Sequence, residues 1–138
     1  MDIKVYDSLP DAAADIRRRV FMDEQGFRDE FDEYEDNSTH FVGYIDGAAV
    51  GTCRIHFAPE FSAHQIGRIA VVKSCRGRHI GEKMVQCAEE YLVSKGIKNA
   101  VILAQNQAVG FYEKLGYVKT DYTCMEEHCP HVLMTKNL

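Results

Sequence analysis

The sequence is poor in several features that would assign it to a special class of protein. It has no tryptophan, only three prolines and no excess of positive charge, since 16 Lys and Arg residues face 21 Asp and Glu residues for a net charge of −5. No stretch approaches the roughly 20 uncharged apolar residues that a membrane-spanning helix needs, and the first residues lack the basic and apolar regions of a signal peptide. We therefore expect a cytoplasmic protein with no membrane partner. We also expect no nucleic-acid partner, because such binders are normally basic.

The cysteines form no recognisable disulfide framework. They are five in number, stand far apart, and two of them fall inside segments with the pattern of a strand and a helix. Reduced thiols fit this usage better than disulfides, and no motif of a cysteine nucleophile surrounds any of them. A zinc site would have to draw Cys124, His128, Cys129 and His131 from eight consecutive residues, which is tighter than the paired spacings of structural zinc sites. We therefore predict no metal site.

The composition does provide the material of one packed domain, residues 1–138. Apolar residues make up 46% and charged residues 27%, which excludes a disordered chain, a collagen-like chain and a coiled coil. Hydrophobic periodicity predicts alternating strands and helices without repeat or linker, as in an α/β or α+β domain. The expected strands are 2–6, 40–45, 49–57, 65–72, 101–104, 117–125 and 131–134, and the expected helices are 10–26, 80–96 and 109–115.

Charge is distributed unevenly along the chain. Between Asp23 and Asp36, eight acidic residues and one basic residue give a local charge of −7, whereas between Lys73 and Lys83 four basic residues and one acidic residue give +3. The acidic stretch is compatible either with a solvated loop or with a surface that attracts cations. The basic stretch favours anions.

The basic stretch lies where a predicted strand passes into a predicted helix. The first amides of a helix lack intrahelical acceptors and stand at the positive end of the helix dipole. Gly77 and Gly81 allow close approach of the backbone, and Arg76, Arg78 and Lys83 add positive charge. The glycine pattern of a Rossmann fold and the lysine of a P-loop are both missing. The residues therefore predict a phosphate or pyrophosphate site of another kind.

The stretch RIAVVKSCRGRHIGEKMV, residues 68–85, resembles the acetyl-CoA motif Q/R-x-x-G-x-G/A of the GNAT N-acetyltransferases, with Arg76 first and Gly81 last. His79 stands where the family has its middle glycine. A residue other than glycine serves there if its φ is negative, and an imidazole adds a donor to phosphate. Downstream, GFYEKLGY at 110–117 is similar to the second signature of the family, and 19–25 and 130–134 resemble its ElaA-like branch. Together the similarities cover most of the chain.

This resemblance implies the GNAT acyl-CoA N-acyltransferase fold, an α/β (α+β) domain with a mixed, mostly antiparallel sheet of about seven strands. Helices flank that sheet, and it is splayed between strands four and five. The resemblance also implies acetyl-CoA as co-substrate, its pantetheine arm paired with strand four and its pyrophosphate on the loop amides. The implied cofactor-binding residues are Ile69, Ala70, Val71, Arg76, Gly77, Arg78, His79, Ile80, Gly81, Gln105, Asn106 and Phe111.

The implied reaction is direct transfer of an acetyl group from coenzyme A to a primary amine. Tyr112 matches the position of the general acid that protonates the departing sulfur, and core packing beside Phe111 is its structural alternative. The general base stays open among Glu24, Glu33, His128, His131 and a chain of water molecules. We take His131 as the candidate, because Pro130-His131 recurs in the branch that the chain resembles and begins a strand expected beside the acceptor cleft.

The acidic stretch follows the first helix, a region that borders the acceptor site in this family. It therefore favours a cationic amine, either a small amine or a peptide amine. The substrate-binding candidates are Glu24, Glu33, Asp36 and Gln65, the last standing where histone-modifying relatives have a glutamate. The alternative function is a non-catalytic acyl-CoA sensor or partner module, which His79 and Gln65 favour and Tyr112 opposes. Many relatives are dimers, and a homodimer is compatible with the sequence.

Overall fold

The computed structural model describes all 138 residues. They form one seven-stranded sheet in the order β1-β2-β3-β4-β5-β7-β6, in which only β4 and β5 run parallel. The strands are β1 (Asp2–Tyr6), β2 (Thr39–Ile45), β3 (Ala48–Ala58), β4 (Ala63–Val71), β5 (Asn99–Gln105), β6 (Val118–Glu126) and β7 (Cys129–Asn137). The predicted mixed, mostly antiparallel sheet is confirmed.

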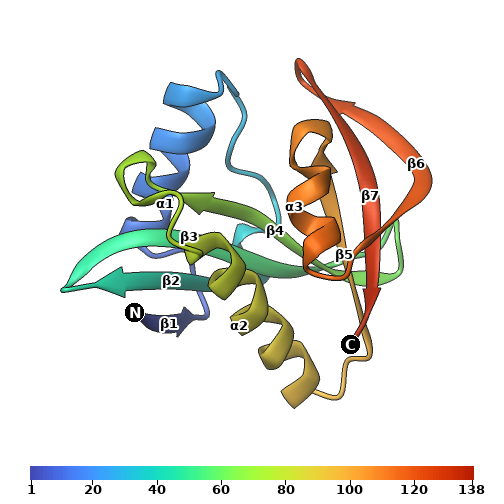
Figure 1. The fold of residues 1–138 in the computed structure, drawn as a ribbon, viewed down its shortest axis with the longest axis horizontal. Helices are drawn as coiled ribbons and strands as arrows, with labels where there is room; N and C mark the ends of the chain where they lie inside the picture. The colour runs from blue at the N-terminus through green and yellow to red at the C-terminus, as the bar shows by residue number, and fades with distance from the viewer.

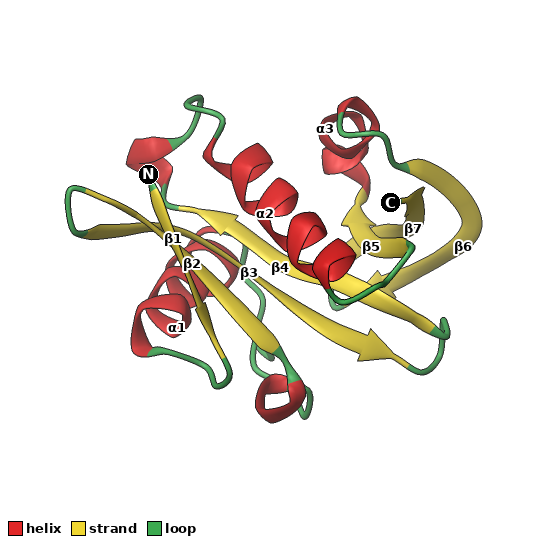
Figure 2. Cartoon of the chain, turned by 90° about the horizontal axis from the view of Figure 1, so that it is seen from below, coloured by secondary structure: helices red, strands yellow, loops and turns green.

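Helices cover both faces of this sheet. The helix α1 (Asp11–Arg17) packs under β2, β3 and β4, and α2 (Ile80–Ser94) lies on the opposite face (Figure 2). The short α3 (Val109–Lys114) lies beside β5 and β6 (Figure 1). Three 3-10 turns complete the chain: η2 (Glu35–Asn37), η3 (Lys73–Cys75) and η4 (Asn106–Ala108). No helix is long and apolar enough to cross a membrane.

The core forms where the apolar stripe of α2 meets the sheet. Ile80, Met84, Ala88 and Leu92 recur at helical spacing and are all buried, so this face contacts β3 and β4 while the charged face stays in water. The predicted boundaries of α2 hold, because Gly96 adopts a positive φ of 79° just beyond its end.

The first helix differs from the continuous α-helix that the pattern predicts. It begins at Asp11, with Pro10 in the N-cap position and no side-chain cap, and it continues from Arg18 to Glu24 as the π-helix η1. The amide of Gln25 donates to the carbonyl of Val20, five residues back, at 3.2 Å. This wider turn determines the directions in which Glu24 and Gln25 leave the helix.

The sheet opens between β4 and β5, as predicted. These strands pair at a single position, Gln65 with Val101. In the β3–β4 register, Thr52 faces Ala70 and Arg54 faces Gly67, so β4 carries one extra residue. That bulge contains Arg68, whose φ is +52°, a left-handed conformation that strains a residue other than glycine. Beyond the bulge, β4 has backbone partners on β3 alone.

Candidate active site

The segment between η3 and α2, which we call the phosphate loop (residues 76–82), presents six consecutive free amides. None of the backbone N–H groups from Gly77 to Glu82 donates to an acceptor in the protein, whereas Arg76 donates back to Lys73 and Lys83 donates to His79. Such a row at the start of a 15-residue helix can bind the oxygens of a phosphate or pyrophosphate. The predicted anion site is therefore built mainly from backbone.

Two residues of the phosphate loop take left-handed conformations. Gly77 has a φ of +79°, and no atom lies within 4 Å of the place where a Cβ would stand. His79 has a φ of +62° and occupies the N-cap position of α2. The condition of a negative φ for a residue other than glycine is therefore not met: His79 adopts a left-handed conformation that glycine takes without strain. Its exposed imidazole lies 3.2 Å from Glu82, measured from Nδ1 to Oε2.

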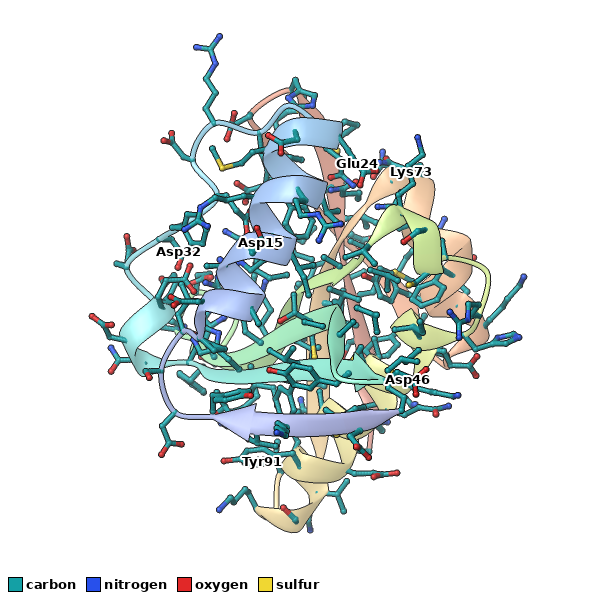
Figure 3. All side chains as sticks on the ribbon, turned by 90° about the vertical axis from the view of Figure 1, so that its left-hand side faces the viewer. Asp15, Glu24, Asp32, Asp46, Lys73 and Tyr91 are labelled. Atoms are coloured by element: carbon teal, nitrogen blue, oxygen red, sulfur yellow. The ribbon has the colours of Figure 1, made fainter.

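The side chain of Arg76 forms an ion pair with Glu24, the last residue of η1. Its two terminal nitrogens donate to both carboxylate oxygens of Glu24 at 2.8 and 2.9 Å, and its Nε donates to the carbonyl of Val71. Figure 3 shows Glu24 beside Lys73 on the same edge. The hydrogen bonds from Arg76, with the nearby positive charges, lower the pKa of Glu24. This carboxylate therefore faces the phosphate loop.

The open part of β4 leads from the phosphate loop into a cleft of about 400 Å³. Ile69 lines this cleft, Ala70 is buried below it, and Ile80 is buried at the start of α2. Phe111 of α3 is 40% exposed, and its ring lies 3.4 Å from the place of a Cβ on Gly81. The implied binding residues on β4, the loop and α3 therefore form one continuous surface.

The cleft also brings together residues from β5 and β7. Gln105 lines the cleft, and its Nε2 donates to the side-chain oxygen of Gln25 at 2.8 Å. Asn106 is exposed and lies outside the lining. Tyr112 and His131 both line the cleft, although α3 and β7 supply them from distant parts of the chain. The structure thus joins the two predicted catalytic residues in one cavity.

Tyr112 is buried, with its ring packed edge-on against Phe111 and Tyr117. The hydroxyl has no hydrogen-bond partner in the protein, unlike that of Tyr117, which donates to Glu89 at 2.7 Å. Burial raises the pKa of Tyr112, so the phenol is protonated at neutral pH. Packing and chemistry are both compatible with this position.

His131 is held in one tautomer. Its Nδ1 lies 2.9 Å from the carbonyl oxygen of Cys129, and because a carbonyl can only accept, Nδ1 carries the proton of the neutral ring. The lone pair then lies on Nε2, which has no partner in the protein. In the sheet, His131 stands opposite Gln105 on one side and Cys124 on the other.

Much of the acidic stretch neutralises three arginines. Arg17 of α1, Arg54 of β3 and Arg68 of β4 contact the carboxylates of Glu30, Asp32 and Glu35 at 2.6 to 3.2 Å. Burial opposes ionisation of Asp32 and Glu35, but hydrogen bonds and charges of Arg54 and Arg17 outweigh it and lower both pKa values to about 2. This arginine–carboxylate cluster carries no net charge, and it anchors the loop to the bulge at Arg68.

The predicted substrate-binding residues are only partly in the cleft. Gln65 lines it, whereas Glu24 faces the phosphate loop and Glu33 and Asp36 are exposed outside the lining. Six carboxylates and two arginines line the cleft, giving a net charge of −4: Asp29, Glu30, Asp32, Glu60, Glu126 and Glu127, with Arg54 and Arg68. The acidic wall exists, but mostly other residues build it.

One wall residue connects the turn between β6 and β7 to the loop that follows η1. Glu127, in the turn between β6 and β7, accepts hydrogen bonds from the amides of Arg28 and Asp29 at 2.9 to 3.0 Å. These bonds lower the pKa of Glu127. Next to them, His128 packs on Phe27 with ring centroids 4.9 Å apart. We call this connection between the turn and the loop the strap.

The cleft residues that sequence reasoning missed include Tyr34, His56 and Glu60. His56 is a buried strand residue that faces Gln65 in the β3–β4 register. Pairing the two strands across the turn at 59–62 would have placed His56 beside Gln65. No local pattern marks Tyr34 or Glu60, because only the folded loops bring them to the cleft.

The cysteine and histidine residues near the C-terminus are dispersed. All five cysteines are free thiols. Cys124 stands opposite His131 in the β6–β7 register, whereas the ring of His128 packs on Phe27. No group of three or more His, Cys, Asp or Glu side chains is arranged to hold a metal ion.

Comparison with known proteins agrees with this geometry. Residues 5–117 match the model of the Acetyltransferase (GNAT) family. A Bacillus subtilis protein named as a candidate acetyltransferase is 36% identical over 143 residues, covering 99% of this chain and 96% of its own length. A candidate N-acetyltransferase structure from Lactobacillus plantarum superposes with a TM-score of 0.86 at 29% identity, covering 100% and 99% of the two chains.

Escherichia coli ElaA shares the fold with a TM-score of 0.84 at 21% identity, covering 98% of both chains. The seven-stranded sheet and its helices thus form a known architecture. The chain belongs to the acetyltransferase (GNAT) family, with acetyl transfer as its general activity and acetyl-CoA as its co-substrate.

Proposed function

We propose that this protein is an N-acetyltransferase that moves an acetyl group directly from acetyl-CoA to a primary amine. The observation that carries the proposal is the pairing of Tyr112 and His131 in one cleft. Tyr112 presents a protonated hydroxyl, the neutral tautomer of His131 presents the lone pair of Nε2, and neither atom has a partner in the protein. A sensor module would not require an acid and a base at the same opening, so we favour an enzyme.

The residues present fit acetyl-CoA, which supplies a thioester as the activated acyl group. The amides of residues 77–82 would hold the pyrophosphate, assisted by Arg76, Arg78 and the His79 imidazole. The open edge of β4 at Ile69, Ala70 and Val71 would pair with the amide-bearing arm. Gln105 or Asn106 would contact that arm, and Phe111 would flank it beside Gly81.

His131 would serve as the general base. A protonated amine cannot attack a carbonyl, so the enzyme must first remove a proton from the acceptor. Nε2 of His131 can accept it, because Nδ1–H is fixed on the Cys129 carbonyl. The resulting positive charge would lie near Glu126, which lines the same cleft.

Tyr112 would serve as the general acid. Because burial raises the pKa of its phenol, the hydroxyl carries its proton and would donate a hydrogen bond to the sulfur as the bond between carbon and sulfur breaks. The proton that the sulfur takes up would be restored to Tyr112 from the one that the attacking amine loses. The net charge of −4 along the cleft lining favours a cationic acceptor, whether a small amine or a peptide amine.

The test combines binding with turnover. Acetyl-CoA is titrated calorimetrically into the purified protein, and release of free thiol is then followed against a panel of amines. We expect micromolar binding and amine-dependent thiol release. Binding without release from any amine would indicate the sensor alternative instead. An absence of binding would contradict the assignment of the loop and the β4 edge.

A further inference from the structure

One wall of the cleft contains a buried histidine that no protein group satisfies. His56 is only 4% exposed, it lines the cleft, and its Nδ1 is fully buried without a hydrogen-bond partner. Its Nε2 has no partner in the protein either. Burial, with the positive charge of Arg54, holds the pKa of His56 at about 4. The imidazole is therefore neutral at physiological pH and can accept a hydrogen bond from a ligand.

Two further acceptor groups surround His56. The ring of Tyr34 stacks on it, with centroids 4.5 Å apart and an angle of 23°. Glu60, in the turn after β3, lies close enough to raise the pKa of Tyr34 and to act on His56. Neither the Tyr34 hydroxyl nor the Glu60 carboxylate has a partner in the protein. We call His56, Tyr34 and Glu60 the far subsite.

The charge of the far subsite is negative although two arginines lie nearby. Arg54 and Arg68 are both held by carboxylates of the arginine–carboxylate cluster, at 2.7 to 3.2 Å. Glu60 makes no such pair. Because the arginines are already neutralised, Glu60 supplies the uncompensated charge at this end of the cleft. A ligand group that donates N–H and carries positive charge suits Glu60, the Tyr34 hydroxyl and Nε2 of His56, whereas the buried Nδ1 of His56 is out of its reach.

The strand register gives a lower bound on the distance between the far subsite and the reactive end. His56 faces Gln65, and Gln65 pairs with Val101 of β5. His131 pairs with Gln105, four residues farther along β5, which is about 13 Å at the rise of an extended strand. Since β3 and β7 are also separated by β4 and β5, the two ends are at least as far apart as the ends of an extended chain of about ten atoms.

We propose that the acceptor is a linear polyamine whose reacting amine lies beside His131 while a distal ammonium group occupies the far subsite. The proposal rests on the amine acetylation proposed above and names its substrate class. Glu60 supplies the charge, and His56 and Tyr34 accept the remaining N–H bonds. A cleft of about 400 Å³ suits such a small molecule.

The test measures binding separately from turnover. Spermidine and n-octylamine, a monoamine of similar length, are titrated calorimetrically into the protein saturated with coenzyme A. We expect spermidine to bind at least about tenfold more tightly. His56→Phe keeps the stacking ring, and Glu60→Gln keeps the shape; each should weaken spermidine binding three- to tenfold and leave octylamine unchanged. Glu33→Gln, an exposed carboxylate outside the cleft, is the matched control.

The outcomes separate this proposal from the function on which it rests. Equal binding of the two amines, or variants that weaken both equally, would overturn the far subsite even if thiol is released with both. Selective loss of spermidine binding without thiol release from any amine would support the subsite and contradict the acetyltransferase proposal. Urea unfolding of each variant shows whether it is folded, and Glu60→Gln, an exposed position, keeps the test valid if His56→Phe does not fold.

Discussion

The phosphate loop and the acceptor cleft are built on opposite principles. The loop draws its donors from six consecutive residues, and those donors are backbone amides that any sequence with the right dihedral angles would present. The cleft draws its polar groups from η1, the loop at 29–36, the β3–β4 turn and β7. A site made of backbone is fixed by local conformation, whereas a site made of side chains depends on long-range packing.

The two regions also differ in how many of their charged side chains form ion pairs. Among the arginines and lysines at and directly after the phosphate loop, Arg78 and Lys83 make no ion pair and Arg76 pairs with Glu24. Beside the cleft, three arginines and three carboxylates cancel, so that only Asp29, Glu60 and Glu126 lack both an ion pair and a hydrogen bond. The cleft can thus select cations only because its own cations are neutralised.

The largest effect is expected from the removal of Arg17, which tests how much the arginine–carboxylate cluster stabilises the protein. Arg17 is 1% exposed and contacts both Glu30 and Glu35, so Arg17→Met removes one of the two arginine partners of each of these buried carboxylates. We expect a loss of about 3–5 kcal/mol of unfolding free energy, measured by urea denaturation. Arg19→Met, which removes an exposed pair with Asp15, should cost less than about 1 kcal/mol. Equal losses would show that the cluster is not what holds the cleft.

Removing the Tyr112 hydroxyl tests whether chemistry and coenzyme A binding are separable. Tyr112→Phe keeps the edge-on packing against Phe111 and Tyr117. We expect kcat to fall about 100-fold while the Kd of acetyl-CoA changes less than twofold, measured by thiol release and calorimetry. The exposed Tyr122→Phe is the control. An unchanged kcat would restrict Tyr112 to packing.

The free energy of unfolding should decrease in two stages as the pH is lowered. Burial holds the pKa of His56 near 4 and lowers the pKa of His40. Below about pH 6.5, the unfolded chain therefore binds more protons than the folded chain. Stability should therefore fall as pH decreases, by about 2 kcal/mol between pH 6.5 and 5. Asp32 and Glu35, with pKa values of about 2, extend the loss from about pH 4.5 downward.

Urea denaturation at a series of pH values measures both stages. His56→Phe should flatten the first stage and leave the second, because it removes only the imidazole. It should also raise stability at neutral pH, since the buried Nδ1 without a partner is removed. An unchanged slope between pH 6.5 and 5 would contradict the burial of a neutral His56.

The smallest effect, on the affinity for acetyl-CoA, is expected from Glu24, which connects η1 to the phosphate loop. Glu24→Gln removes a negative charge that pairs with Arg76 beside the free amides. Because the pair is partly exposed, its contribution is at most about 1 kcal/mol, so we expect acetyl-CoA to bind up to about fivefold more tightly. Calorimetry measures this change, with Glu33→Gln as control. Weaker binding would show that Glu24 positions Arg76 instead of competing for it.

Features formed by consecutive residues were predictable from the sequence. Hydrophobic periodicity located the strands and helices, and the spacing of Arg76 and Gly81 located the phosphate loop. The dihedral angle of His79 was not predictable, because the pattern of residue types does not show that the helix start demands a left-handed residue there. The π-helical end of the first helix was equally hidden, since its apolar positions also fit an α-helix.

For the cleft, the sequence predicted the sign of the charge but not the residues that supply it. The acidic stretch pointed to cations, but Glu30 and Glu35 are buried against Arg17, and Glu24 turns toward the other site. Which carboxylates remain free depends on arginines that are far away in sequence, at 54 and 68. His56 escaped notice for the same reason, because its neighbours Tyr34 and Glu60 come from separate loops.

The strap couples two segments that stand 98 and 99 residues apart in the chain. Because Glu127 is hydrogen bonded to the amides of Arg28 and Asp29, the turn between β6 and β7 and the loop after η1 are held together without any strand pairing. Both segments supply lining residues of the cleft. A displacement of one wall is therefore transmitted to the other.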